Sequence, residues 1–167
     1  VEDAATDLSF DRLQEAVAAQ EKAIARAPGL IPAREELSEL YGALGRRRNE
    51  TEQLQVLAGL EGGRVERRIA VGLAYARAGN VDLAVLTLAS ALEQAPDHPL
   101  VYGALGRVWL DIAITRRDRP DALGKALEAL ERSASAPSAT SEVKTLYGRA
   151  LRRDGQVEAA ERVLQQA

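Results

Sequence analysis

The stretch Gly72–Asn80, which reads GLAYARAGN, sets the register of an internal repeat. Thirty-four residues after Gly72 the chain carries Gly106, and a large aromatic residue follows each glycine by three positions, as Tyr75 and Trp109. A fixed period of this length is typical of folds in which one supersecondary unit repeats along the chain. The period therefore indicates the architecture before any single element is assigned.

The repeat unit contains two predicted helices that are joined by a tight turn. We predict helices over 66–78 and 81–94, with Gly79 between them, because glycine readily ends a helix and tolerates a positive φ. Pro96 then stops the second helix. One antiparallel pair cannot bury both of its apolar faces, so neighbouring pairs must stack to form a core.

This pattern resembles the tetratricopeptide repeat family. The resemblance is strongest in 65–98, where an apolar residue precedes the glycine and an aromatic residue follows it. Small and bulky residues then alternate toward a final proline, at Ala84, Leu88, Ala91, Leu92 and Pro96. The resemblance extends over nearly the whole chain. It implies an all-α fold, an α-solenoid of antiparallel helix pairs that forms a right-handed superhelix.

The period divides the chain into an acidic lead and one predicted solenoid domain. The lead covers 1–8, and the domain covers 9–167. Ser9 is a candidate N-terminal cap for the first helix. Within the domain we predict a lone helix at 9–27 and repeats at 31–62, 65–98, 99–136 and 141–167.

Two of the predicted repeats depart from the regular pattern. The repeat at 31–62 has Ser38 in place of the glycine and Glu50 in place of a small residue, so we expect a looser helix crossing there. The repeat at 99–136 has about four extra residues within ITRRDRPD, which is about one α-helical turn. We therefore predict that its first helix continues to about Arg117, with Pro120 near the start of the second.

The predicted ends of the solenoid are not polar on their outer faces, as terminal repeats normally are. In the last helix Val157, Val163 and Leu164 leave an apolar surface. Two interpretations stay open: the chain is a segment of a longer protein, or this end packs against a second copy or another protein. The chain begins at Val1 and contains no methionine, so we expect that a preceding segment has been removed.

The composition argues against catalysis and against several kinds of ligand. With no cysteine and one histidine, His98, the chain lacks the side chains for a zinc–thiolate site or thiol catalysis. We interpret His98 as a solvated turn residue, and we find neither a phosphate-binding loop nor a nucleophile with a nearby base. The sequence therefore predicts a protein that is not an enzyme and has no cofactor or metal ion.

Charge and hydropathy limit the partners and leave the compartment open. A net charge of −3 gives no general attraction to nucleic acid or anionic lipid. No apolar run approaches the roughly 20 residues that span a bilayer, so we expect no membrane insertion of this segment. A chain without cysteine suits both the cytoplasm and the periplasm.

The resemblance also gives candidate binding residues, because the first helix of each repeat lines a concave groove in that family. The groove positions are acidic in 31–62, largely apolar in 65–98, mixed in 99–136 and basic in 141–167. The candidates are Glu35, Glu39, Ile69, Leu73, Arg77, Arg107, Asp111, Leu146, Arg149 and Arg152. Such a gradient could orient an extended peptide by charge and anchor it by apolar contacts. The alternative is that the arginines form only a solvated helix face.

We therefore predict a non-catalytic protein–protein interaction module that binds a partner protein or an extended peptide in this groove. One alternative is an interaction or regulatory segment of a larger enzyme or of an envelope or secretion assembly protein. Another is a self-assembling scaffold, a homo-oligomer joined through the apolar ends. Some members of the family bind acidic chaperone tails through a lysine and asparagine clamp, and the corresponding positions here, such as Glu39 and Leu73, lack it.

Overall fold

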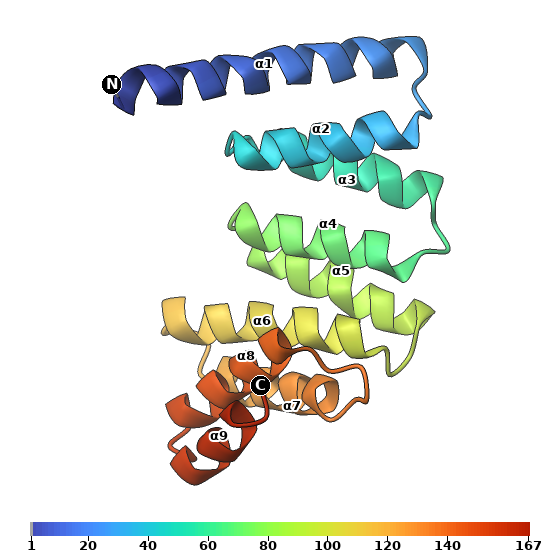
Figure 1. The fold of residues 1–167 in the computed structure, drawn as a ribbon. Coiled ribbons are helices and arrows are strands. Elements are labelled where there is room, and N and C mark those ends of the chain that lie inside the picture. Colours follow the sequence, from blue (N-terminus) through green and yellow to red (C-terminus); the bar gives the residue numbers. More distant parts are fainter. Residues whose placement is uncertain (1) are drawn as a thin grey trace. The chain divides into compact units, whose positions relative to one another are not determined.

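The computed structural model describes residues 2–167, and the regular secondary structure within that range is entirely α-helical (Figure 1). The predicted fold class, an all-α helical repeat, is therefore confirmed. The chain divides into two units, Val1–Ala78 and Gly79–Ala167. The first unit contains α1 (Glu2–Arg26), α2 (Ile31–Ala43), α3 (Arg47–Leu60) and α4 (Val65–Arg77). The second contains α5 (Val81–Gln94), α6 (Pro99–Thr115), α7 (Ala122–Ala134), α8 (Ser141–Arg153) and α9 (Val157–Leu164).

The helix boundaries of the regular repeat agree with the sequence pattern. The helices predicted at 66–78 and 81–94 are α4 and α5, each within one residue at either end. Gly79 follows α4 with φ +81, a conformation that L side chains rarely adopt. In the enlarged repeat α6 ends at Thr115, close to the predicted Arg117, and Pro120 lies shortly before α7. A single continuous domain over 9–167 remains a prediction.

The N-terminal helix begins earlier than the sequence analysis predicted. α1 starts at Glu2, so the segment assigned as an acidic lead is helical from Glu2 onward, and Val1 lies outside the described residues. Ser9 consequently lies inside α1, and its assignment as the N-terminal cap was wrong. The leading residues contain neither proline nor glycine, and acidic residues are favourable near a helix N-terminus. These preferences extend the helix past a serine that could have capped it.

The first unit is built by packing each helix on the next, α1 on α2, α2 on α3 and α3 on α4. Val17, Leu37 and Tyr41 form a buried cluster between α1 and α2. The Tyr41 hydroxyl donates a hydrogen bond to Glu21 Oε1 at 2.6 Å. Burial and this carboxylate raise the pKa of Tyr41 to about 12. The ring thus fills the core while its hydroxyl keeps a polar partner.

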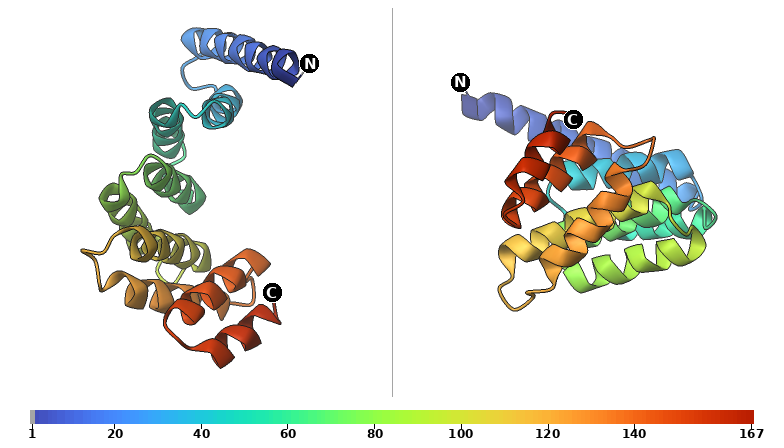
Figure 2. Two further views of the ribbon diagram at one scale, coloured as in Figure 1. Left: turned by 90° about the vertical axis from the view of Figure 1, so that its left-hand side faces the viewer. Right: turned by 90° about the horizontal axis from the view of Figure 1, so that it is seen from below.

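The second unit is centred on the packing of α6 against α7, which Figure 2 shows alongside the final pair α8 and α9. Val101, Val108 and Ile112 of α6 and Leu130 of α7 are buried almost completely. At Gly106 a Cβ atom would lie 2.4 Å from Leu130 Cγ, closer than real atoms approach. Gly106, which repeats Gly72 at the thirty-four-residue interval, therefore stands where α6 packs too tightly on α7 to accept a side chain without displacement.

Candidate functional site

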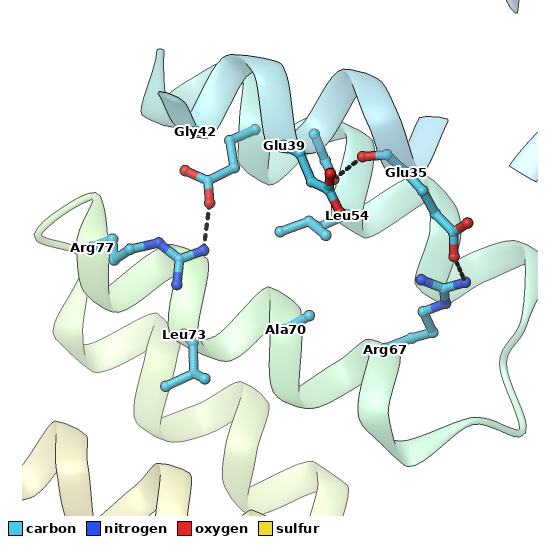
Figure 3. A pocket seen from close by; sticks show the side chains of 10 residues that line it. Glu35, Glu39, Gly42, Leu54, Arg67, Ala70, Leu73 and Arg77 are labelled. Carbon is cyan, nitrogen blue, oxygen red and sulfur yellow. Dashed lines mark hydrogen bonds and ion pairs between the residues drawn. The ribbon is translucent and has the colours of Figure 1, made fainter. Parts of the chain in front are cut away.

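A hollow of about 700 Å³ lies among α2, α3 and α4 in the first unit (Figure 3). We call it the α2–α4 groove. Residues three or four apart share one face of a helix, so the helical spacing places the lining residues on the faces that surround the hollow. The lining residues are Glu35, Ser38, Glu39 and Gly42 from α2, Glu50 and Leu54 from α3, and Arg67, Ala70, Leu73 and Arg77 from α4.

The middle of the groove is apolar. Leu54 of α3 and Ala70 and Leu73 of α4 are all half-buried and line the hollow. In Figure 3, Ala70 and Leu73 lie on α4 between the two arginines of that helix, Arg67 and Arg77. A ligand side chain that covered these three residues would remove their remaining apolar surface from water, which favours binding.

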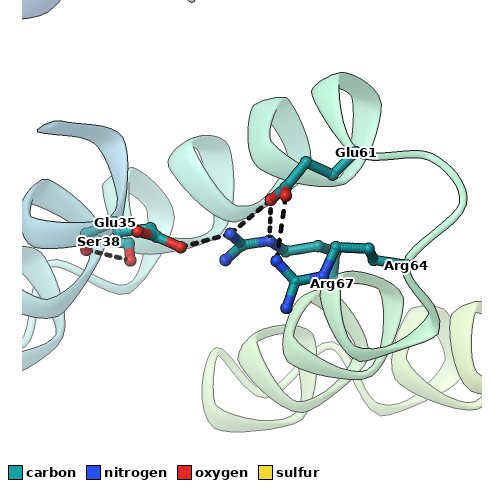
Figure 4. A network of polar contacts seen from close by, with 5 residues as sticks. All are labelled: Glu35, Ser38, Glu61, Arg64 and Arg67. Carbon is teal, nitrogen blue, oxygen red and sulfur yellow. Dashed lines mark hydrogen bonds and ion pairs between the residues drawn. The ribbon is translucent and has the colours of Figure 1, made fainter. Parts of the chain in front are cut away.

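One end of the groove is closed by a network of ion pairs (Figure 4). Arg67 contacts Glu35 of α2, and its Nε lies 2.6 Å from Glu61 Oε2. Arg64 Nη1 lies 3.1 Å from the other oxygen of Glu61. The hydrogen bond from Arg64, aided by Arg67, lowers the pKa of Glu61, and the hydrogen bond to Glu35 raises the pKa of Arg67. Glu61 and Arg67 are therefore both held in their charged forms.

The other end of the groove contains a buried carboxylate. Glu50 of α3 is only 6% exposed, and it pairs with Arg47 at 3.1 Å and with Arg77 of α4. Arg47 Nη1 also donates to the Gly42 carbonyl oxygen at 3.1 Å. Buried carboxylates are costly unless they are paired and hydrogen-bonded. Glu50 stands at a position where the repeat favours a small residue. Its charge is balanced by Arg47 of α3 and Arg77 of α4.

Charge in the α2–α4 groove is consequently negative on balance. Arg67 and Arg77, which line the groove, both pair with glutamates. Glu39 is exposed on the wall and has no ion-pair partner in the part of the chain that the structure describes. The groove thus presents an apolar floor beside an unpaired carboxylate.

The structure brings together four of the five predicted groove residues of the first unit. Glu35, Glu39, Leu73 and Arg77 line the groove, and Ile69 does not. Six lining residues were not among the candidates from the sequence: Ser38, Gly42, Glu50, Leu54, Arg67 and Ala70. The signal available for Glu50 was its unusual place at a small-residue position, which indicated a local change in packing but not a pairing with Arg77.

In the second unit two hollows adjoin at Arg153. One, of about 230 Å³, is lined by Leu110, Ile114, Arg149, Arg152 and Arg153. The other, of about 470 Å³, is lined by Ala113, Arg116, Arg117, Arg119, Pro120, Leu123 and Arg153. The predicted residues Arg149 and Arg152 line the first hollow, whereas Arg107, Asp111 and Leu146 line neither. Arg107 instead pairs with Glu142.

The remaining polar residues give little indication of a metal-binding or catalytic site. Among the described residues no group of three or more histidine, cysteine, aspartate or glutamate side chains is arranged to hold a metal ion. His98 is half-buried at the start of α6, and its Nδ1 is buried without a hydrogen-bond partner. The interpretation of His98 as a solvated turn residue was therefore wrong for this nitrogen. No helix within residues 2–167 combines the length and apolar character that crossing a membrane requires.

Solved structures match the chain over most of its length. The crystal structure of MamA matches with a TM-score of 0.69 and 20% sequence identity, covering 96% of this chain and 88% of MamA. TTC0263, a thermophilic tetratricopeptide-repeat protein of Thermus thermophilus, matches with a TM-score of 0.69 and 17% identity, covering 98% and 87% of the two chains. This chain has a tetratricopeptide-repeat-like fold.

A further solved structure that matches the chain is that of a tetratricopeptide-repeat protein that binds peptide. YrrB, a tetratricopeptide-repeat protein with an unusual peptide-binding site, matches with a TM-score of 0.60 and 14% identity, covering 94% of this chain and 77% of YrrB. No protein-family model matches the sequence, and no curated protein matches it. The tetratricopeptide-repeat resemblance inferred from Gly72 and its repeats is confirmed at the level of the fold.

Proposed function

We propose that this chain is a non-catalytic interaction module that binds an extended segment of a partner protein in the α2–α4 groove. The observation that carries the proposal is the groove itself, a hollow of about 700 Å³ with an apolar floor and an exposed carboxylate on its wall. The tetratricopeptide-repeat-like fold supports it, because stacked helix pairs commonly present extended binding surfaces.

The chemistry of the groove favours a segment that combines aliphatic and basic side chains. Leu54 and Leu73 offer apolar contact to an aliphatic side chain. Glu39 offers a carboxylate to a lysine or arginine next to it. The two arginines of the groove do not repel such a ligand strongly, since glutamates already neutralise them.

The test is a selection from a random peptide-display library on the parent protein alone, after which the affinity of the selected peptides for a Glu39→Lys/Leu73→Ala variant is measured. We expect the peptides retained by the parent to be enriched in lysine or arginine beside leucine, isoleucine or valine. Their affinity for the variant should be lower by at least about tenfold, since an apolar contact and a charge pair are lost together.

A Glu15→Lys variant is the matched control for charge. Glu15 lies exposed on α1 and does not line the groove, and its substitution changes the net charge by the same amount as Glu39→Lys. Circular dichroism establishes that the variants remain helical. If the selected peptides bind the Glu39→Lys/Leu73→Ala variant as tightly as the Glu15→Lys control, the groove is not the binding site.

A further inference from the structure

The two hollows of the second unit form one arginine-rich surface, which we call the arginine cleft. It is lined by six arginines, Arg116, Arg117, Arg119, Arg149, Arg152 and Arg153. No acidic side chain lines either hollow among the described residues. Concentrated charge of one sign focuses the field and attracts ligands of the opposite sign.

The enlarged repeat and the last turn of α8 bring these arginines together. α6 extends to Thr115, and the segment that follows carries Arg116, Arg117 and Arg119. Arg149 and Arg153 are four residues apart on α8 and so share one helix face. The two sides are joined where Arg153 Nη2 donates to the Ala113 carbonyl oxygen at 3.2 Å.

Most of the charge in the cleft is not used by the protein's own ion pairs. Arg119 pairs with Asp82 at 3.3 Å and with Asp121 at 3.8 Å, and its guanidinium stacks over Trp109 at 5.3 Å. The other five arginines have no ion-pair partner in the described part of the chain. A cluster of unpaired like charges contributes no pairing energy to the fold, so an external anion is the partner that would satisfy it.

The carboxylates near the cleft leave five of its arginines without an ion pair among the described residues. Asp121 contacts Lys125 Nζ at 2.6 Å, and this hydrogen bond lowers the pKa of Asp121. Asp154, next to Arg153, accepts a hydrogen bond from Gln156 at 2.8 Å. Asp118 and Asp111 are exposed but line neither hollow. The arginine cleft thus keeps its positive charge although acidic residues lie close in the sequence.

The cleft also contains an apolar contact point. Ile114 is 47% exposed and lines the first hollow beside Leu110, which is buried. Leu123 is half-buried in the second hollow. An aliphatic side chain of a ligand could cover Ile114 while flanking carboxylates reach the arginines, whose planar guanidinium groups bind carboxylates bidentately.

A protein segment fits this surface better than a nucleic acid does. Single-stranded nucleic acids bind through exposed aromatic platforms that stack on the bases. Trp109, which one of these arginines contacts, is only 8% exposed, and its ring is covered by Arg119 and by Lys125 at 4.5 Å. The net charge of −3 also opposes general binding to a polyanion.

We propose that the arginine cleft is a second binding surface that takes an acidic protein segment, with aspartate or glutamate side chains flanking an aliphatic residue. The inference rests on the proposed role in protein binding but not on the α2–α4 groove, which lies in the other unit and favours basic segments.

The experiment is a fluorescence-polarisation titration of the full chain with a labelled peptide of glutamate, aspartate and leucine. The reference probe is the same peptide with glutamine and asparagine in place of the acids. We expect the acidic peptide to bind at least about tenfold more tightly than the neutral one and to weaken as salt is added, because the contacts are charged and partly exposed.

Variants then locate the site. The double variant Arg149→Glu/Arg152→Glu should weaken the acidic peptide at least about tenfold, because it replaces attraction with repulsion. The matched control, Arg48→Glu/Arg162→Glu, reverses the same number of exposed charges outside the cleft and should stay within about twofold of the parent. Equal weakening by the two double variants would overturn the proposal.

Two further measurements separate this proposal from its competitors. Glu39→Lys should leave binding of the acidic peptide unchanged, because Glu39 lies in the other unit. A chain that binds the acidic peptide but no basic peptide would contradict the α2–α4 groove proposal and leave the arginine cleft proposal intact. A single-stranded oligonucleotide should compete poorly. If it displaces the acidic peptide at lower concentration than unlabelled acidic peptide does, the assignment to a protein segment is wrong.

Discussion

Arginines in the two units have different electrostatic surroundings. In the α2–α4 groove Arg67 pairs with Glu35 and Glu61, and Arg77 pairs with Glu50. In the arginine cleft five of six arginines have no carboxylate partner among the described residues. Arginines that line a groove therefore do not by themselves indicate anion binding. The carboxylates around them decide whether they stabilise the fold or remain available to a ligand.

The side chains packed where helices cross also differ between the two units, and this difference again concerns charge. In the first unit Ser38 donates to the Glu35 carbonyl oxygen at 2.8 Å, and the buried Glu50 stands where a small residue is usual. In the second unit Gly106 meets the fully buried Leu130. The first unit thus places a carboxylate inside its crossing, which Arg47 and Arg77 balance, whereas the second packs Gly106 against hydrocarbon and needs no arginine there.

The largest expected effect concerns the hydrocarbon crossing. Gly106→Leu should lower the free energy of unfolding by about 1–3 kcal/mol or more, because even a Cβ would lie 2.4 Å from Leu130 Cγ and 3.1 Å from the Leu130 backbone nitrogen. Urea denaturation followed by circular dichroism measures the change. Gly124→Ala in α7 is the control, since among the described residues no atom beyond its own helix backbone and its chain neighbours lies within 4 Å of its Cβ position. An unchanged midpoint for Gly106→Leu would show that the crossing is looser than described.

The next effect concerns the charged crossing. Glu50→Gln should lower the free energy of unfolding by about 1–2 kcal/mol, because two arginines lose their shared carboxylate. The loss lies below that for a fully buried pair, since Arg47 and Arg77 are both partly exposed and can be solvated. Equilibrium urea denaturation again gives the value. A variant as stable as the parent would contradict a structural role for the buried carboxylate.

A smaller effect is expected from Glu61 and depends on pH. Because its pKa is lowered in the folded protein, its contribution to stability is present above the ordinary glutamate pKa of about 4.3 and is lost as the pH falls through the lowered value. The difference in Tm between the parent and Glu61→Gln should therefore shrink on acidification. The exposed residue Glu158 supplies a control of equal charge change, Glu158→Gln, measured under the same conditions.

The smallest effect is expected in the arginine cleft. Arg149→Glu/Arg152→Glu should change the free energy of unfolding by less than about 0.5 kcal/mol, because both side chains are exposed and lose no ion pair to any residue that the structure describes. The comparison with Glu50→Gln under identical urea conditions is the decisive one. Comparable destabilisation by the two changes would mean that the cleft arginines support the fold after all.

The sequence was sufficient to predict the elements whose signals are local. The bounds of α4 and α5 follow from Gly79 and the repeated apolar spacing, and the extension of α6 follows from the longer interval after Gly106. The start of α1 was missed because the acidic lead is outside the repeat, so only weak helix preferences act there. A period of apolar residues carries no information about such a segment.

The charge pairs could not be predicted in the same way. Arg67 and Glu35 are separated by 32 residues, and Arg77 and Glu50 by 27. Their contact depends on the rotamers and relative position of three helices, whereas the repeat pattern specifies only which residue sizes fit the crossing. The repeat pattern placed Glu35, Glu39, Leu73 and Arg77 on the faces of α2 and α4 that line the hollow, but the pairing that neutralises the arginines could be found only from the structure.

The extension between α6 and α7 has an evolutionary consequence. It adds about one helical turn to an otherwise regular repeat, and three of the six cleft arginines follow directly from it. Removing the inserted residues would restore the regular period without touching Gly106 or Leu130. Loops tolerate such insertions and deletions far better than helix interiors do. A single small insertion or deletion could therefore have added this surface to an ancestral repeat, or could remove it from a descendant, without redesign of the core.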